Sequence, residues 1–193
     1  MNANRQPPIF TDACRIATEL YGLSASARSL PGERDYNFYL KTDSRREFVL
    51  KIAQAEERRD TLDMQNRALE HLAAYDPSLL LPQVCLTSTG ETIAQVITGD
   101  GTTHLARLLT YISGRLFAET RPHTPELLAS LGSLLGRMDR ALQDFSHLAA
   151  HRTLKWDLQH AGWIRDYLRH IVQPERRAIV ERFLSAFEDS AGE

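Results

Sequence analysis

Lys51 is the residue of this sequence best placed to bind an anion. Two runs, Tyr36–Leu40 and Phe48–Ile52, alternate along the chain with the period of two that is typical of β-strands. In the second run the apolar residues share one face and Lys51 lies on the other, after a polar loop at Gly32–Asn37 that could fold over a bound anion. The pattern fits two interpretations, a phosphate-binding lysine or a solvated lysine on a sheet.

The composition limits the classes of function. A chain of 193 residues with 42% hydrophobic content is the size of one domain, or of two lobes that share a core. The formal net charge of −2 argues against a general nucleic-acid or polyanion binder, because such proteins carry a net basic surface. Any basic site must therefore be local.

The cysteines and the N-terminus indicate a compartment. Cys14 and Cys85 form no CxxC pair and no Cys/His cluster, so the sequence predicts neither a disulfide framework nor a structural zinc site. The N-terminus lacks an apolar signal core, and no apolar run approaches the roughly 18 residues of a membrane span. We expect a cytoplasmic protein with no membrane partner.

The elements that must position Lys51 follow from periodicity and turn residues. Before the hairpin the sequence predicts a helix at Thr11–Tyr21 and a weak strand at Ser24–Leu30. After it comes a helix at Glu56–Ala74, with Asp60 or Thr61 as its cap.

The apolar face of this helix is interrupted by Gln65, whose amide needs a partner where the helix meets the sheet. Packing behind the hairpin would point Gln65 towards the neighbourhood of Lys51.

The remaining pattern changes from strand to helix. Three further strands are predicted at Val84–Thr87, Thr92–Ile97 and His104–Tyr111. Thr124, Pro125 and Glu126 mark the start of a helix with a long apolar stripe. The members of that stripe are Leu128, Leu131, Leu135, Met138, Leu142 and Phe145. Two more helices are predicted at Trp156–Val172 and Pro174–Glu188.

This order of elements is typical of the protein-kinase-like fold. We predict an α+β class: an N-terminal lobe over residues 1–112, with a five-stranded antiparallel sheet and one inserted helix, and the first helices of a helical C-terminal lobe over 113–193. Several segments also resemble the aminoglycoside phosphotransferase (choline kinase-like) superfamily, closest to the hydroxylysine kinase group and to kinase domains fused to class III aminotransferases. These segments are Gly32–Asn37, Val49–Lys51, Gln65–Leu69, Arg107–Arg115 and Leu131–Leu142.

The resemblance implies an ATP site. Lys51 would contact the α- and β-phosphates beneath the Gly32–Asn37 loop, which includes Arg34 and Asp35 and offers backbone N–H groups. No GxxxxGK[ST] motif is present, so this loop is not a P-loop.

The resemblance also implies a hinge for adenine. The carbonyl of Thr110 and the amide of Ile112 would pair with the adenine edge, and Leu109 would lie at the back of the pocket. Side-chain identity says little here, because a hinge reads adenine through main-chain groups. The alternative is an ordinary buried strand that ends at Gly114.

A helix glutamate pairs with the phosphate lysine in many kinase-like enzymes. The matching position here is Gln65, a neutral amide that can orient an ammonium but supplies no charge. Glu57, Asp63 and Glu70 are alternative partners for Lys51, and the sequence does not choose among them.

The catalytic loop of the family is missing. Neither His-Gly-Asp…Asn nor a later metal-binding aspartate is found, so we assign no catalytic and no metal-binding residue to this chain. Asp139 and Asp157 are better interpreted as acids on helix surfaces or caps. We therefore expect a truncated kinase that is inactive alone, with ATP as its cofactor and Mg²⁺ bound only in the complete enzyme.

Two functions remain in view. The first is the ATP-binding part of a phosphotransferase acting on a hydroxyl of an amino-containing metabolite, which resemblance suggests is hydroxylysine-, ethanolamine- or aminoglycoside-like. The second is a non-catalytic kinase-fold module for binding or for docking onto a fused downstream domain. In either case the apolar faces at Trp163, Phe183 and Phe187 predict self-association, because a whole kinase would cover them.

Overall fold

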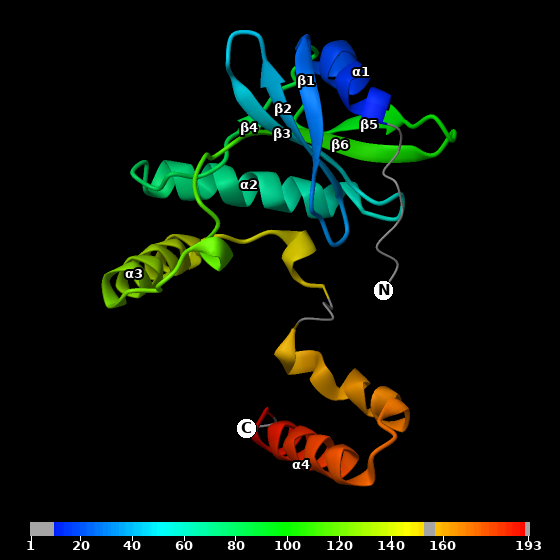
Figure 1. Ribbon diagram of the computed structural model, residues 1–193, viewed down its shortest axis with the longest axis vertical. Coiled ribbons are helices and arrows are strands. Elements are labelled where there is room, and N and C mark those ends of the chain that lie inside the picture. The colour runs from blue at the N-terminus through cyan, green and yellow to red at the C-terminus, as the bar shows by residue number, and fades with distance from the viewer. Residues whose placement is uncertain (1–9, 153–156, 192–193) are drawn as a thin grey trace. The chain divides into compact units, whose positions relative to one another are not determined.

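The computed structural model describes residues 10–152 and 157–191, which divide into two compact units, Met1–Ala150 and His151–Glu193 (Figure 1). The first unit holds every strand that the structure describes, and the second is helical. The lobe boundary that we expect at residue 112 falls inside the first unit and stays a prediction.

An antiparallel sheet forms the centre of the first unit. Its order is β1-β2-β3-β6-β4, and β5 also pairs with β6. The strands are β1 (Ala25–Leu30), β2 (Tyr36–Thr42), β3 (Glu47–Ile52), β4 (Val84–Cys85), β5 (Ala94–Ile97) and β6 (Thr103–Thr110).

The sheet has six strands, which match the six strand segments predicted along the sequence, although we expect a five-stranded sheet for the fold class. Both β4 and β5 pair with the edge of β6 that lies opposite β3: β5 along its first half, and β4 at Leu108 and Leu109. Eight residues of β6 are long enough to accept two short partners end to end. The six strands therefore occupy five positions across the sheet.

One face of the sheet carries the main hydrophobic core. Helix α1 (Phe10–Tyr21) packs there through Ile16 and Ala17, against Phe38, Leu40 and Leu50 of the hairpin. These five side chains are at most 1% exposed, so the predicted alternation of apolar and polar positions is confirmed. Burying a leucine or phenylalanine side chain stabilises a fold by roughly 1.5–3 kcal/mol, which makes this face the main source of stability in the sheet.

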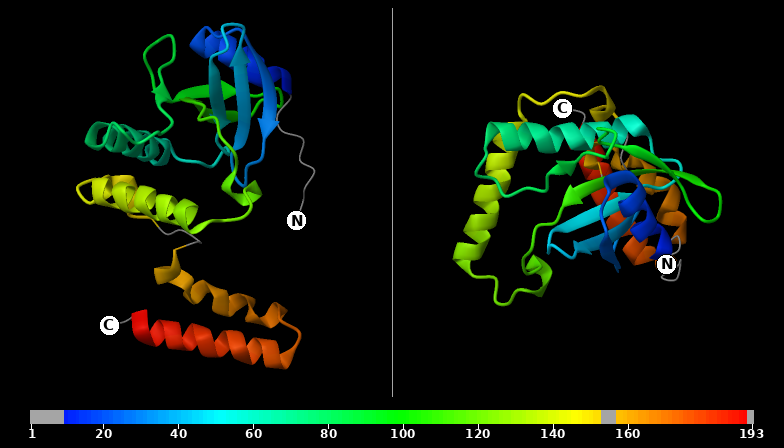
Figure 2. Two further views of the ribbon diagram at one scale, coloured as in Figure 1. Left: turned by 60° about the vertical axis from the view of Figure 1, so that its left-hand side comes forward. Right: turned by 90° about the horizontal axis from the view of Figure 1, so that it is seen from above.

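Helix α2 (Arg59–Tyr75) lies against the other face, as the views in Figures 1 and 2 show. The helix contacts the sheet through Leu62, which packs with Ala53 and Ile93. The predicted cap is wrong: the N-cap is Arg58, which makes no side-chain capping bond. Asp60 lies inside the first turn instead, where its carboxylate pairs with the Arg58 guanidinium.

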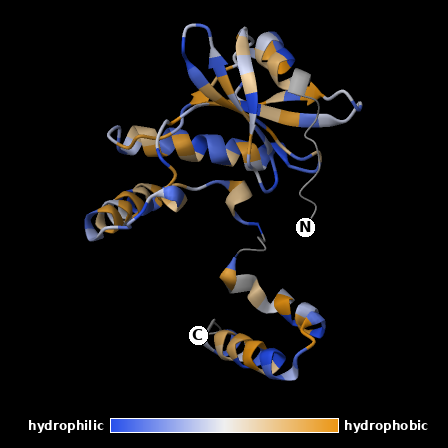
Figure 3. Cartoon of the chain, in the orientation of Figure 1, coloured by the Kyte–Doolittle hydropathy of each residue, from blue (hydrophilic) through white to orange (hydrophobic). Residues whose placement is uncertain are grey.

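Helix α3 (Pro125–Leu142) follows a short 3₁₀ turn, η1 (Phe117–Glu119). The predicted cap is confirmed, since the Thr124 hydroxyl accepts a hydrogen bond from the Leu127 amide at 3.3 Å. The predicted apolar stripe is only partly covered. Leu131, Met138, Leu142 and Phe145 are half-buried, and Met138 and Leu142 pack beside the buried Ala141 and Leu72 of α2. Leu128 and Leu135 are half exposed, on a helix that Figure 3 colours as largely hydrophobic. A further 3₁₀ turn, η2 (Leu148–Ala150), ends the unit.

The second unit consists of η3 (Leu158–His170) and α4 (Pro174–Ala191), packed through Ala161, Leu168 and Leu184. The first of these elements has 3₁₀ rather than α-helical geometry. Trp156, where we expect this helix to begin, lies outside the described residues.

Three aromatic side chains of the second unit were expected to be exposed. Trp163 and Phe183 are 39% and 63% exposed, and Phe187 is half-buried. Across both units, no helix in the described ranges is long and apolar enough to cross a membrane.

Candidate functional site

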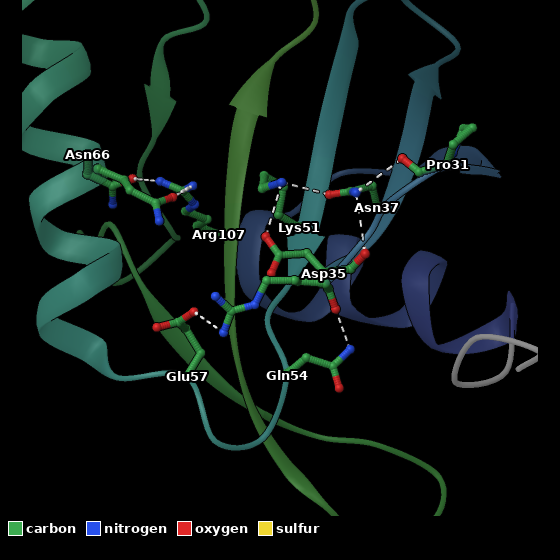
Figure 4. Close-up of polar contacts among 10 residues, drawn as sticks. Pro31, Asp35, Asn37, Lys51, Gln54, Glu57, Asn66 and Arg107 are labelled. Atoms are coloured by element: carbon green, nitrogen blue, oxygen red, sulfur yellow. Dashed lines mark hydrogen bonds and ion pairs between the residues drawn. The ribbon is translucent and has the colours of Figure 1, made fainter. Parts of the chain in front are cut away.

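The strand register creates a polar row one residue away from the hydrophobic core. Asn37 on β2 pairs with Lys51 on β3, and Lys51 pairs with Arg107 on β6. Residues directly opposite each other in antiparallel strands project from the same face. The three side chains therefore lie side by side on the face that meets α2 (Figure 4).

Lys51 contacts the loop before β2. Its Nζ donates a hydrogen bond to Asn37 Oδ1 at 2.8 Å and lies 3.1 Å from Asp35 Oδ2. The lysine and aspartate side chains are 24% and 20% exposed, so this ion pair is only partly screened by solvent. The Gly32–Asn37 loop thus supplies the partners that we sought on the helix.

The three acids considered as partners of Lys51 make other contacts. Glu57 Oε2 lies 3.5 Å from Arg34 Nη2, and Asp63 pairs with Arg67 on its own helix. Glu70 lines a cavity of about 280 Å³ between α2 and β4.

Gln65 reaches the sheet at Arg107, the residue that pairs with Lys51 in the strand register. Its Oε1 accepts a hydrogen bond from Arg107 Nη2, and the neighbouring Asn66 Oδ1 accepts from Nη1 at 2.7 Å. The prediction that Gln65 needs a partner on the sheet is confirmed. The amide points to the neighbourhood of Lys51, as expected, and contacts the guanidinium beside that lysine.

Arg107 is a buried cation with neutral partners. The residue is only 4% exposed, and its buried Nε has no hydrogen-bond partner among the described residues. Desolvation lowers the pKa of Arg107, and the charges of Asp35 and Glu57 oppose that change. An arginine remains protonated under such conditions, so the site contains a permanent positive charge next to Lys51.

The Gly32–Asn37 loop is held by a network of polar contacts. Asn37 Nδ2 donates to the carbonyls of Pro31 and Asp35, both at 3.4 Å. A Cβ atom on Gly32 would overlap the Asn37 amide and the Asp35 carbonyl, so only glycine fits there. The carbonyl of Arg34 accepts from Gln54 Nε2.

Arg34 itself points largely into solvent. Its side chain is 63% exposed and makes the ion pair with Glu57 described above.

The predicted hinge lies at the end of β6. Leu109 is buried, whereas Thr110 and Ile112 are half-buried. The Thr110 amide donates to the Gln83 carbonyl at 2.9 Å, and the Thr110 hydroxyl accepts from the Gln83 amide at 2.8 Å. These two hydrogen bonds hold the end of β6 in place. The contacts of Thr110 and Ile112 with adenine stay a prediction.

Metal binding has no candidate site in the part of the chain that the structure describes. Within those ranges, no three His, Cys, Asp or Glu side chains gather in a way that could hold a metal ion. Asp139 is exposed on α3, as expected of an acid on a helix surface.

Sequence reasoning missed Arg107 and Asn66 as members of the site. The available signals were Gln65 and Asn66 adjacent on an otherwise amphipathic helix, and an arginine inside the apolar run of β6. A buried arginine must find acceptors, and two consecutive amides on the facing helix are suitable ones.

Solved structures of known proteins share this fold. An amicoumacin kinase in complex with AMP-PNP, Ca²⁺ and Ami matches with a TM-score of 0.66 and 14% identity, over 89% of this chain and 50% of that one. A microcompartment-associated aminopropanol kinase matches with a TM-score of 0.61 and 18% identity, over 79% of this chain and 46% of that one. The kinase-like α+β fold predicted from the sequence is therefore confirmed.

Curated relatives share the sequence more closely. Hydroxylysine kinases from Bos taurus and Mus musculus are 31% and 29% identical to this chain. Each alignment covers 94% of the chain and 53% of the relative, so the chain spans about half the length of these proteins. The model of the phosphotransferase enzyme family matches residues 26–191. Together with the polar row and the kinase-like sheet, this match shows that the chain belongs to the phosphotransferase enzyme family.

Proposed function

We propose that this chain is the nucleotide-binding part of an ATP-dependent phosphotransferase that acts on a hydroxyl of a small amino-containing metabolite. Family membership supports the reaction class, and the hydroxylysine kinases support a hydroxylysine-like acceptor. Ethanolamine-like and aminoglycoside-like acceptors are the further choices, which the resemblance of the sequence implies. Because the chain spans half of its relatives, we propose this activity for a protein that includes their remaining portion.

The observation that carries the proposal is an excess of positive charge. Lys51 and Arg107 are neighbours in the polar row, and Asp35 is the acid that makes an ion pair with Lys51. Gln65 and Asn66 accept hydrogen bonds from Nη2 and Nη1 of the guanidinium without neutralising its charge. A partly buried site with surplus positive charge and a flanking glycine loop suits the phosphates of a nucleotide.

Each remaining site residue has a place in this proposal. Lys51 would bind the α- and β-phosphates, with the Gly32–Asn37 loop above them and Arg34 at the solvent side. The Thr110 carbonyl and the Ile112 amide would hold the adenine edge against Leu109. ATP would supply the phosphoryl group, and these residues would bind and orient the nucleotide. We assign neither a catalytic base nor a Mg²⁺ ligand to the described residues.

The test is nucleotide-dependent thermal stability. A ligand at 100 times its Kd stabilises the folded state by about 2.7 kcal/mol, which raises the Tm of a domain of this size by roughly 5–10 °C. We expect ATP to raise the Tm of the wild-type protein and Lys51→Ala to abolish that rise. Lys41→Ala is the matched control, because Lys41 is an exposed lysine of the same hairpin that pairs with Glu47.

The result separates the two functions. An equal ATP-induced rise in wild type and Lys51→Ala would remove Lys51 from the site. A wild-type protein with no rise at saturating ATP would favour the alternative, a non-catalytic kinase-fold module for docking.

Two further expectations belong to this proposal. We propose a cytoplasmic location, and self-association through the exposed faces of Trp163 and Phe183. Light scattering at high protein concentration tests self-association, and a strictly monomeric species would contradict it.

A further inference from the structure

The carboxylate that pairs with Lys51 comes from the loop that would cover the phosphates. Asp35 lies in the segment between β1 and β2, Asn37 follows at the start of β2, and both side chains contact the Lys51 ammonium. The carboxylate of Asp35 is therefore held at a cation that the proposed function assigns to a phosphate. Two anions cannot share such a position without repulsion.

The α2 acceptors that face the polar row are taken by Arg107. Its guanidinium spans Gln65 and Asn66, so α2 is joined to β6 rather than to Lys51 (Figure 4). Asn66 is itself fixed, being 1% exposed and donating to the Thr92 carbonyl at 3.4 Å. On the side of α2, the site is thus held by hydrogen bonds to neutral amides. The carboxylate that pairs with Lys51 comes from the loop.

The partners leave the two cations incompletely neutralised. Asp35 provides one carboxylate at Lys51, and Glu57, the other acid near the loop, pairs with Arg34 at 3.5 Å. Arg107 also keeps a buried Nε without a hydrogen-bond partner in the described part of the chain. The charges of Asp35 and Glu57 both act on Arg107. Counted with Lys51 and Arg34, the group still has three cations and two carboxylates, and this surplus positive charge attracts a further anion where solvent screening is weak.

We propose that Lys51 and Arg107 form a two-cation phosphate subsite in which Asp35 is the built-in counter-ion that a nucleotide phosphate replaces. The inference rests on the proposed function, since it assumes that phosphates enter at Lys51. Asn37 stays on Lys51 as a neutral acceptor and keeps the ammonium aimed at the loop. Release of Asp35 frees the loop tip, so phosphate binding and loop position are coupled.

The test compares nucleotides with and without phosphates on an Asp35→Asn variant. Calorimetric titration with ADP is done in EDTA, so that no carboxylate acts through a metal ion, and adenosine serves as the phosphate-free probe. Removing the competing charge should lower the Kd for ADP roughly three- to tenfold, the range expected for one partly exposed ion pair. The Kd for adenosine should not change. Asp43→Asn, in the exposed turn of the same hairpin, is the matched control and should leave both values unchanged.

The outcomes distinguish this inference from the proposed function. Wild-type binding of ADP with an equal or weaker affinity in Asp35→Asn overturns the counter-ion role and leaves the ATP site intact. An equal gain for adenosine also overturns it, because the effect would not involve phosphate. Absence of ADP binding in both proteins overturns the inference and the proposed function together.

A second variant tests the other cation. Arg107→Met removes the buried charge while keeping a long apolar side chain, and should weaken ADP binding roughly tenfold or more with adenosine unaffected. Arg59→Met is the matched control, because Arg59 also ties α2 to the sheet side, through the Ile93 carbonyl at 2.8 Å. Equal affinity for ADP in a folded Arg107→Met protein excludes Arg107 from the subsite. If the Arg107→Met protein does not fold, the Asp35→Asn titration by itself tests the proposed subsite.

Discussion

Two rows of side chains cross the same three strands one residue apart, and they differ in almost everything else. The row of Phe38, Leu50 and Leu108 is at most 1% exposed and packs with α1. The row of Asn37, Lys51 and Arg107 faces α2, and its two cations are bound by amides and one carboxylate. A shift of one residue along a strand thus separates the stabilising core from the candidate site.

The two rows depend on different kinds of information. An apolar row needs only volume and burial, so a close approximation to its packing follows from the alternation of residue types. A polar row needs a specific partner for each donor and acceptor, because an unsatisfied buried group is costly. Substitutions that act on one row and not on the other can therefore test whether core and site are separable.

The largest effect is expected in the apolar row. Leu50→Ala removes a fully buried side chain and should lower the free energy of unfolding by roughly 2–5 kcal/mol. Urea unfolding measures the change, with the 77% exposed Leu80 as the matched leucine for Leu80→Ala. The nucleotide affinity of the folded variant should remain that of wild type. A large loss of affinity would show that the core row and the polar row are not independent.

A smaller effect is expected at the loop that serves the polar row. In Gly32→Ala the new Cβ would meet the Asn37 side chain and the Asp35 backbone, so the loop must shift. We expect a destabilisation of roughly 1–3 kcal/mol and weaker binding of ATP, measured by thermal shift with and without nucleotide. Gly132→Ala on α3 is the control, since a Cβ there meets nothing within 4 Å. Unchanged ATP binding in Gly32→Ala would separate the loop from the site.

The smallest effect is a pH dependence farther along the polar face. The Tyr39 hydroxyl donates to Glu47 Oε1, which lowers the pKa of Glu47 below its usual value. The carboxylate therefore stabilises the fold above its unfolded pKa of about 4.3, and this contribution is lost as the pH falls through the lower folded value. The Tm difference between wild type and Glu47→Gln should be present at neutral pH and shrink towards pH 3. A difference that is constant over this range would contradict the role of the charge.

Particular residues show which features of the fold could be predicted from the sequence. Periodicity was sufficient for the hairpin and for the buried faces of Phe38 and Leu50, and capping chemistry was sufficient for Thr124. The same rules placed the cap of α2 at Asp60 or Thr61, where the structure has Arg58. They also predicted one apolar stripe along α3, without indicating that Leu128 and Leu135 would be half exposed. Capping and periodicity rules use only neighbours in the sequence, so they do not indicate which part of the fold covers a helix face.

By itself the sequence determined which residues could do chemistry: a lysine opposite an apolar strand face, a glycine loop before it, and a helix amide in need of a partner. Only the tertiary structure decided the pairing, because hydrogen bonds and ion pairs are chosen by distance in space. The register brought Arg107 beside Lys51, and Arg107 took Gln65 and Asn66. Lys51 was thereby left to Asn37, its partner in the β2–β3 register, and to Asp35, whose contact depends on how the preceding loop folds back over the sheet.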